Sequence, residues 1–180
     1  MLKVLAGIIL LASAATVRAQ DSIKLVPNFR IGPEPTGQCR GADLSLRHIS
    51  DDAAMGGHNL TEYAFKNESL SACTLKGYPE FELLNKSAGL LPRGRAANTR
   101  KLFGDEAPSN PQLVTIDPGK EATFRVYTNS GGAGYTGKPC PMSRWVRIVA
   151  PGTTRAFILK GEIRFCRKAQ VSAVRAGTAE

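Results

Sequence analysis

The chain has 180 residues, of which 42% are hydrophobic and 22% are charged, and its formal net charge is +9. This length suits one domain with short tails, and the composition excludes a collagen-like chain and an intrinsically disordered one. The positive charge favours contact with anionic polymers, but it identifies neither a fold nor a partner.

Residues 1–19 have the pattern of a signal peptide. Lys3 precedes an uncharged apolar run, residues 4–15, which is shorter than the ~20 residues of a membrane span. Val17 and Ala19 stand at the positions of a cleavage site, so we predict a cut after Ala19. A retained, uncleaved anchor is the alternative.

Cleavage at this site has two consequences for the mature chain. The segment contains Lys3 and Arg18 and no acidic residue, so its removal lowers the formal charge from +9 to +7. No cysteine precedes Cys39, so we expect no lipidated cysteine, and no later apolar run has the length of a membrane span. We therefore expect a secreted or periplasmic product without a transmembrane segment in the mature chain.

Residues 20–38 are expected to form an extended linker. They are polar, they include Pro27, Pro33 and Pro35, and they show no sustained period. The folded domain is predicted to span residues 39–174, and residues 175–180 are predicted to form a flexible C-terminal tail.

Strands are predicted wherever apolar and polar residues alternate with a period of two. The alternation is clearest in residues 44–47, 61–66, 81–83 and 122–127. Further candidates are residues 112–116, 144–149, 155–160, 162–166 and 170–174. Turn signals such as Asp117-Pro118-Gly119 and Pro151-Gly152 separate these segments.

The fold class follows from the absence of a convincing helical period, because a parallel sheet would need helices for its crossovers. We predict an all-β chain, an antiparallel β-sandwich of about eight or nine strands, with a closed barrel as the alternative. Residues 90–111 are expected to be a long loop with one edge strand. The aromatic side chains that we place in the core are Phe65, Phe124, Trp145 and Phe165.

Four cysteines, all in the mature part, indicate two disulfides in an oxidising compartment. Successive cysteines are separated by 34, 67 and 26 residues, whereas zinc ligands stand in closely spaced pairs, so we expect no metal site. Three pairings are possible. We predict sequential closure, Cys39 with Cys73 and Cys140 with Cys166, and the other two pairings stay open.

No catalytic constellation is recognisable, so we expect no enzyme and no cofactor. The rival interpretation is an envelope hydrolase that uses scattered carboxylates, of which Glu62, Glu68, Glu80 and Glu82 could approach one another in space.

A loose basic group is the one candidate binding site that the sequence offers. It consists of Arg93, Arg95, Arg100 and Lys101, and it is a candidate site for a polyanion. An ordinary solvated basic surface is the alternative. An acidic cell-envelope polymer or a protein partner fits this surface, and we expect no nucleic acid.

Two adjacent motifs resemble the hallmark of the domain-of-unknown-function family numbered 4232. They are Tyr63-Ala64-Phe65-Lys66-Asn67-Glu68-Ser69 and Cys73-Thr74-Leu75-Lys76-Gly77-Tyr78-Pro79. In that family a strand ending in Phe-x-Asn precedes a Cys-Thr-Leu-x-Gly-Tyr-Pro turn, and Cys39, Pro118-Gly119 and Cys166 also stand where the family has them.

The resemblance covers residues 39–174 and implies an immunoglobulin-like sandwich in an exported bacterial protein. The family brings no shared catalytic residue, and its members are often lipoproteins, from which this chain differs by lacking the lipidated cysteine. We therefore expect an exported, non-catalytic module that binds or organises a partner at the cell envelope. A purely structural spacer is the second alternative beside the hydrolase.

Overall fold

The computed structural model describes residues 37–102, 105–106, 110–131 and 136–177, with backbone only at 105–106. The predicted signal peptide, and the predicted linker up to residue 36, lie outside the described residues. No helix in the described part of the chain is long and apolar enough to cross a membrane.

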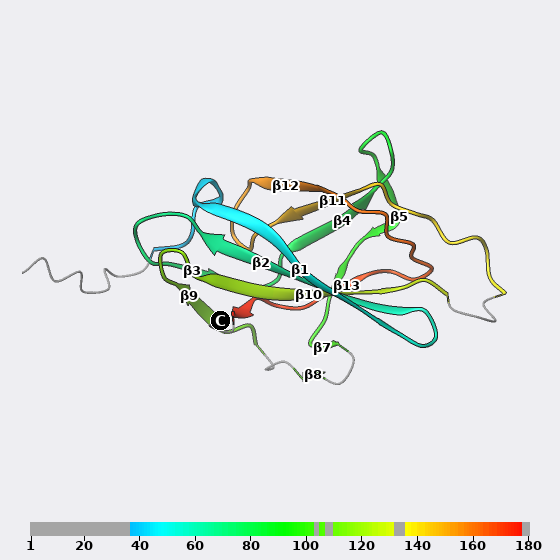
Figure 1. Ribbon diagram of the computed structural model, residues 1–180, viewed down its shortest axis with the longest axis horizontal. Coiled ribbons are helices and arrows are strands. Elements are labelled where there is room, and N and C mark those ends of the chain that lie inside the picture. Colours follow the sequence, from blue (N-terminus) through cyan, green and yellow to red (C-terminus); the bar gives the residue numbers. More distant parts are fainter. Residues whose placement is uncertain (1–36, 103–104, 107–109, 132–135, 178–180) are drawn as a thin grey trace, which may run out of the picture. The chain divides into compact units, whose positions relative to one another are not determined.

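Two sheets form the body of the domain (Figure 1). The six-stranded sheet is antiparallel except for the β13–β6 pair, and its order is β1 (Leu44–Ala54), β2 (His58–Asn67), β10 (Glu121–Asn129), β13 (Gln170–Val171) and β6 (Ala97–Asn98), with β14 (Arg175–Ala176) also on β10. The four-stranded sheet has the order β12 (Ala156–Lys160), β11 (Trp145–Val149), β4 (Glu80–Leu84) and β5 (Leu90–Arg95).

Two strand pairs and one short helical turn complete the described elements. β3 (Cys73–Lys76) pairs antiparallel with β9 (Leu113–Ile116), and β7 (Lys101–Leu102) pairs with β8 (Asp105–Glu106). A 3-10 turn, Gly41–Asp43, leads into β1.

The two sheets face each other across an apolar core, so the predicted β-sandwich is confirmed. Phe65 of β2 stacks on Phe124 of β10 with ring centroids 5.1 Å apart, and it also meets Phe157 of β12 at 6.0 Å. Tyr63 of β2 lies 6.1 Å from Phe81 of β4. Because these ring pairs join one sheet to the other, the inner faces form a single core.

The core prediction is right for Phe65, Phe124 and Phe165 and wrong for Trp145. The first three are fully buried, whereas Trp145 retains 36% of its accessible surface. Val146 and Ile148 take the inward positions of β11, so the alternation of the strand directs Trp145 to the outer face.

Several predicted strand boundaries differ from the structure. Residues 90–111 contain β5, which is an edge strand as expected, but also β6, β7 and β8. Residues 162–166 form no strand and contribute only the bridge between Arg164 and Met142. At the C-terminus, β14 extends the pairing beyond residue 174, where the sequence places the start of a tail.

A tight turn joins β9 to β10 at the predicted Asp117-Pro118-Gly119 signal. The amide of Lys120 donates to the carbonyl of Asp117 at 2.9 Å, and Gly119 has φ +74°. This geometry is a type II turn, in which proline fits the first central position and the second requires positive φ.

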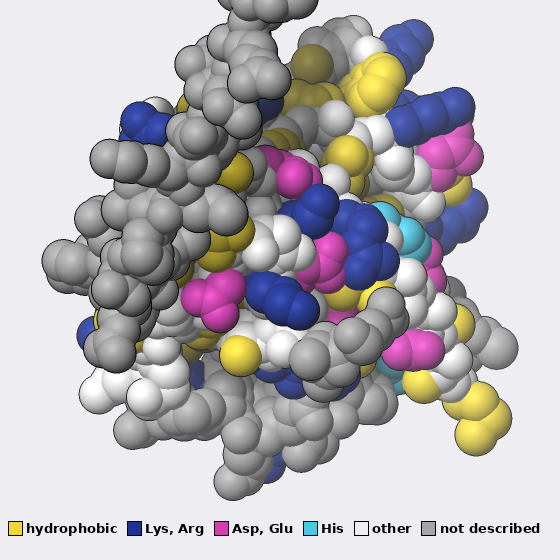
Figure 2. All heavy atoms as spheres, turned by 60° about the vertical axis from the view of Figure 1, so that its left-hand side comes forward, with side chains coloured by type: hydrophobic (Ala, Val, Ile, Leu, Met, Phe, Trp, Pro, Cys, Tyr) yellow, Lys and Arg dark blue, Asp and Glu magenta, His cyan; other side chains and the backbone are white. Residues whose placement is uncertain are grey.

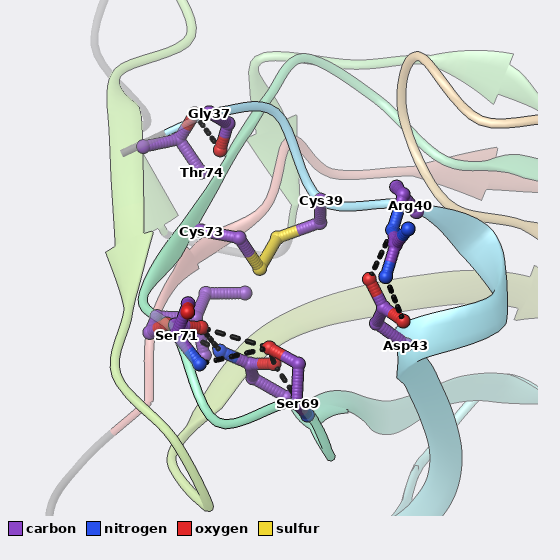
Figure 3. The surroundings of a disulfide bond; sticks show 10 residues. Gly37, Cys39, Arg40, Asp43, Ser69, Ser71, Cys73 and Thr74 are labelled. Carbon is purple, nitrogen blue, oxygen red and sulfur yellow. Dashed lines mark hydrogen bonds and ion pairs between the residues drawn. A yellow bond between two sulfur atoms is a disulfide. The ribbon is translucent and has the colours of Figure 1, made fainter. Parts of the chain in front are cut away.

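Both predicted disulfides are present with the sequential pairing. Cys39 joins Cys73 with a Cα–Cα distance of 4.8 Å, and Cys140 joins Cys166 at 4.6 Å. Figure 3 shows how the first bridge ties the segment before β1 to the start of β3. Next to it the amide of Cys39 donates to the carbonyl of Thr74, and Arg40 pairs with Asp43.

Candidate functional site

A cleft of about 650 Å³ opens between the β1–β2 hairpin and the end of β12. β1 and β12 are edge strands of the two different sheets, so the cleft lies where the sandwich is not closed by further strands. His48, Asp51 and Thr61 line it on the hairpin side, and Lys160 and Arg164 line it on the other. Tyr63 lies between them, and we name this space the Tyr63 cleft.

Tyr63 is a core residue whose polar end reaches the cleft. Its ring stacks on Phe124 with centroids 5.5 Å apart, and only 4% of the residue is exposed. The hydroxyl makes no hydrogen bond to any described residue. Among the described residues, every side-chain nitrogen or oxygen that is fully enclosed has a hydrogen-bond partner. The Tyr63 hydroxyl has no such partner, so it is not fully enclosed and is open to the cleft.

The surroundings keep the Tyr63 hydroxyl protonated. Burial raises the pKa of Tyr63 well above its ordinary value, and the nearby carboxylate of Asp51 raises it further. At neutral pH the phenol therefore presents an O–H donor, and it is not a phenolate nucleophile.

A hydrogen-bonded group forms the hairpin wall of the cleft. Thr61 donates its hydroxyl to Asp51 Oδ1 at 2.7 Å, and His48 Nε2 lies 3.0 Å from Asp51 Oδ2. The ring of His48 meets that of Tyr63 edge-on, with centroids 5.6 Å apart. The contacts fix Asp51 between the two strands of the hairpin.

A β-bulge places Asp51 on this wall. Up to His48 the even-numbered residues of β1 lie opposite the inward residues of β2, with Leu46 opposite Phe65 and His48 opposite Tyr63. The register shifts between His48 and Ser50, after which Asp51 lies opposite Thr61. An unbroken period of two would direct Asp51 away from the cleft, which is why sequence alternation alone did not identify it.

The opposite wall carries basic side chains. Lys160, at the end of β12, and Arg164 have no acidic partner within ion-pair distance among the described residues, whereas Glu162 between them pairs with Arg144. Asp52, which also lines the cleft from β1, likewise has no ion-pair partner there.

The predicted polyanion group is spread over separate elements. Arg93 and Arg95 belong to β5 of the four-stranded sheet, while Arg100 precedes β7 and Lys101 begins it. Arg95 pairs with Glu82 at 2.7 Å. All four residues are exposed, and the proposed site stays a prediction.

The four carboxylates of the hydrolase interpretation are all engaged by basic side chains. Glu62 lies 3.1 Å from Arg175, Glu68 pairs with Lys66 at 3.2 Å, and Glu80 and Glu82 share Arg147. The pKa of Glu68 is lowered, first by the hydrogen bond from Ser45 and then by Lys66. Ion-paired carboxylates are ordinary surface structure, and acidic and basic side chains are interspersed in the same way in Figure 2.

The described residues contain no group of three or more His, Cys, Asp or Glu side chains that could hold a metal ion.

A family model described as "Domain of unknown function (DUF4232)" matches residues 39–179. The chain belongs to this family. The DUF4232 match begins at the cysteine predicted to open the domain and extends past β14.

The Asn67 of the DUF4232 motif has a structural role. It is fully buried, and its amide donates to the carbonyls of Ser71 and Ile116 at 2.8 and 2.9 Å. Its Oδ1 accepts from the amide and the hydroxyl of Ser69. The side chain thereby fixes the loop between β2 and Cys73, and the later glycine of the motif, Gly77, has the positive φ of +115° expected of a turn.

Comparison with other known proteins adds no function to the DUF4232 assignment. A solved β-glucosidase structure from Kluyveromyces marxianus matches at 12% identity and a TM-score of 0.27, over 68% of this chain and 15% of that one. None of the curated proteins compared with the chain matches it.

Proposed function

We propose that this DUF4232 chain is an exported, non-catalytic β-sandwich module that binds a partner at the cell envelope through the Tyr63 cleft. The observation that carries the proposal is the Tyr63 hydroxyl, a nearly buried donor that faces the cleft and has no partner among the described residues. Because the hydroxyl is open on the cleft side, a ligand acceptor at this position can take its hydrogen bond without displacing a protein partner.

Binding fits the chemistry of the cleft better than catalysis does. Tyr63 is held in its protonated form, and Asp51 is occupied by Thr61 and His48. At neutral pH Tyr63 is therefore not a phenolate nucleophile or base, and both carboxylate oxygens of Asp51 are already engaged by neighbouring side chains. Preorganised donors and acceptors around a concave space are typical of a recognition site.

Export is supported by the N-terminal sequence pattern and by the two disulfides, which persist in oxidising compartments. N-terminal sequencing of the exported protein should start at Gln20. A product that still begins at Met1 and stays in the cytoplasm would contradict this part of the proposal.

The binding proposal is tested by the retention of the exported protein on cell-wall material, anionic vesicles and an acidic glycan, each across a salt series. We expect retention by at least one material and its loss in Tyr63→Phe, which keeps the ring in the core and removes only the hydroxyl. Tyr78→Phe, outside the cleft, is the matched control and should be retained normally.

Two results would overturn the binding proposal. Retention that is unaffected by Tyr63→Phe and disappears steeply with salt would assign binding to the basic surface instead. No retention on any material would favour the structural spacer.

A further inference from the structure

Apart from Glu162, whose charge is paired with Arg144, the acidic and basic side chains that line the Tyr63 cleft lie on different walls. Asp51 and Asp52 lie on the β1 wall, and Lys160 and Arg164 lie on the wall formed by the end of β12 and the segment that follows. No ion pair between described residues crosses the cleft, and the His48–Asp51 contact stays within one wall. The cleft thus presents negative charge on one wall, where Asp51 contacts His48 and Asp52 has no ion-pair partner among the described residues, and the unpaired positive charges of Lys160 and Arg164 on the other.

This arrangement discriminates among ligands by charge. A polyanion would meet Lys160 and Arg164 favourably but would be repelled by Asp51 and Asp52, and a polycation would face the reverse. A ligand that carries one charge of each sign can pair with both walls at once. Between its two charges it can place an oxygen acceptor against the hydroxyl of Tyr63.

We infer that the Tyr63 cleft binds a zwitterionic ligand, a short peptide with a free ammonium group and a free carboxylate. The ammonium group pairs with the aspartates of β1, the carboxylate pairs with Lys160 and Arg164, and a peptide carbonyl accepts a hydrogen bond from Tyr63. The inference rests on the proposed binding function and names its ligand class. The volume of about 650 Å³ suits a ligand of this size.

The test uses the tripeptide Ala-Ala-Ala with free ends, titrated into the exported protein and followed by calorimetry and by amide chemical shifts. The comparison probes are its N-acetylated form, its C-terminal amide, the neutral trimer of N-acetylglucosamine and pentaglutamate. We expect the free tripeptide to bind, and each blocked form to bind about tenfold more weakly, because each lacks one charge pair.

Variants assign each end of the peptide to a wall. In Asp52→Asn the loss of affinity caused by N-acetylation of the tripeptide should be smaller than in the native protein. In Lys160→Gln and Arg164→Gln the loss of affinity caused by the C-terminal amide should be smaller. Lys86→Gln, at an exposed turn and not among the residues that line the cleft, is the matched control and should leave both affinity losses unchanged. Thermal unfolding of every variant shows that the fold is intact.

The outcomes separate the ligand class from the binding function. Tighter Tyr63-dependent binding of the neutral trisaccharide, or of pentaglutamate, would overturn the zwitterion inference and leave the proposed function standing. Tyr63-dependent retention on envelope material with no binding of Ala-Ala-Ala would do the same. If retention and probe binding are both indifferent to Tyr63→Phe, the proposed function falls as well.

Discussion

At position 63 one side chain serves both the core and the cleft. The ring of Tyr63 packs against Phe81 and Phe124, while its hydroxyl stays open on one side. Period-two alternation in residues 61–66 puts Tyr63 on the same face as Phe65, but it cannot distinguish a tyrosine that ends in the core from one that ends in a cleft. That distinction depends on the edge strands of the other sheet.

The raised pKa of Tyr63 predicts a loss of stability in alkali. The unfolded chain releases this proton near the ordinary value of 10.0, while the folded chain retains it, so the unfolded state binds fewer protons above that pH. The free energy of unfolding should therefore fall with rising pH, by at most about 1.4 kcal/mol per pH unit from this group. Urea unfolding of the native chain and of Tyr63→Phe, each from about pH 9 to about pH 11, measures this pH dependence of the free energy of unfolding. Parallel pH profiles for the two proteins would contradict the prediction.

Asn67→Ala should destabilise the domain by about 2–4 kcal/mol, because the buried hydrogen bond to the carbonyl of Ile116 is lost together with those that Asn67 makes to Ser69 and Ser71. Chemical denaturation measures the change. Asn85→Ala is the matched control, since Asn85 makes similar hydrogen bonds to backbone amides in an exposed turn and should cost about 1 kcal/mol or less. Equal losses in the two variants would refute the special role of Asn67.

Among the elements, β1 and β11 show where sequence patterns succeed and where they fail. The alternation in residues 44–47 correctly placed a strand, but the bulge after His48 inverts which residues face inward, and a bulge has no reliable signature in one sequence. For Trp145 the size of the side chain suggested burial, while the alternation of β11 assigned that role to Val146 and Ile148. Local pattern was the better guide than residue type.

The outer face of the four-stranded sheet carries an ion-pair row that crosses three strands. Glu82 of β4 keeps only 8% of its side chain exposed and lies between Arg95 of β5 and Arg147 of β11. The arginines reach solvent, but the carboxylate does not. The cost of removing a member should therefore depend on which member is removed.

We expect Arg147→Leu to destabilise the domain more than Glu82→Leu does, with a difference of about 1–3 kcal/mol. Arg147→Leu leaves the buried carboxylate of Glu82 with one partner fewer, whereas Glu82→Leu leaves arginines that water can solvate. Thermal and urea unfolding of both variants measures the difference. The opposite order would show that the carboxylate is better solvated than its burial indicates.

For the whole molecule, the sandwich and the presence of two disulfides could be predicted, because period-two alternation, turn residues and an even number of cysteines are visible in a single sequence, whereas the sequential pairing was one of three that the sequence left open. The Tyr63 cleft could not be predicted, because its walls come from β1 and from residues 159–164, which only the packing of the two sheets brings together. The predicted basic group shows the converse, since closeness in sequence did not place Arg95 and Lys101 in one element.

Each disulfide should contribute to global stability. In the chain-entropy account, a bridge that closes a loop over 34 or 26 residues lowers the entropy of the unfolded chain and so stabilises the folded domain by about 3–4 kcal/mol. Replacing Cys39 and Cys73 together by serine, or Cys140 and Cys166 together, should lower the midpoint of thermal unfolding in non-reducing buffer. Reductant breaks both bridges of the native protein, so it should lower the midpoint of the native protein by more than it lowers that of either double variant. A midpoint that is indifferent to reductant would contradict this expectation.

The sequential pairing of the cysteines has a consequence for a chain that leaves the cytoplasm N-terminus first. The loop from Cys39 to Cys73 is complete before Cys140 emerges, so the first bridge can close when only one partner thiol is present. The second pair then meets no competing thiol. If the chain is exported in this way, oxidation in order of emergence yields the native connectivity, and we expect maturation without a disulfide isomerase that corrects mispaired bridges.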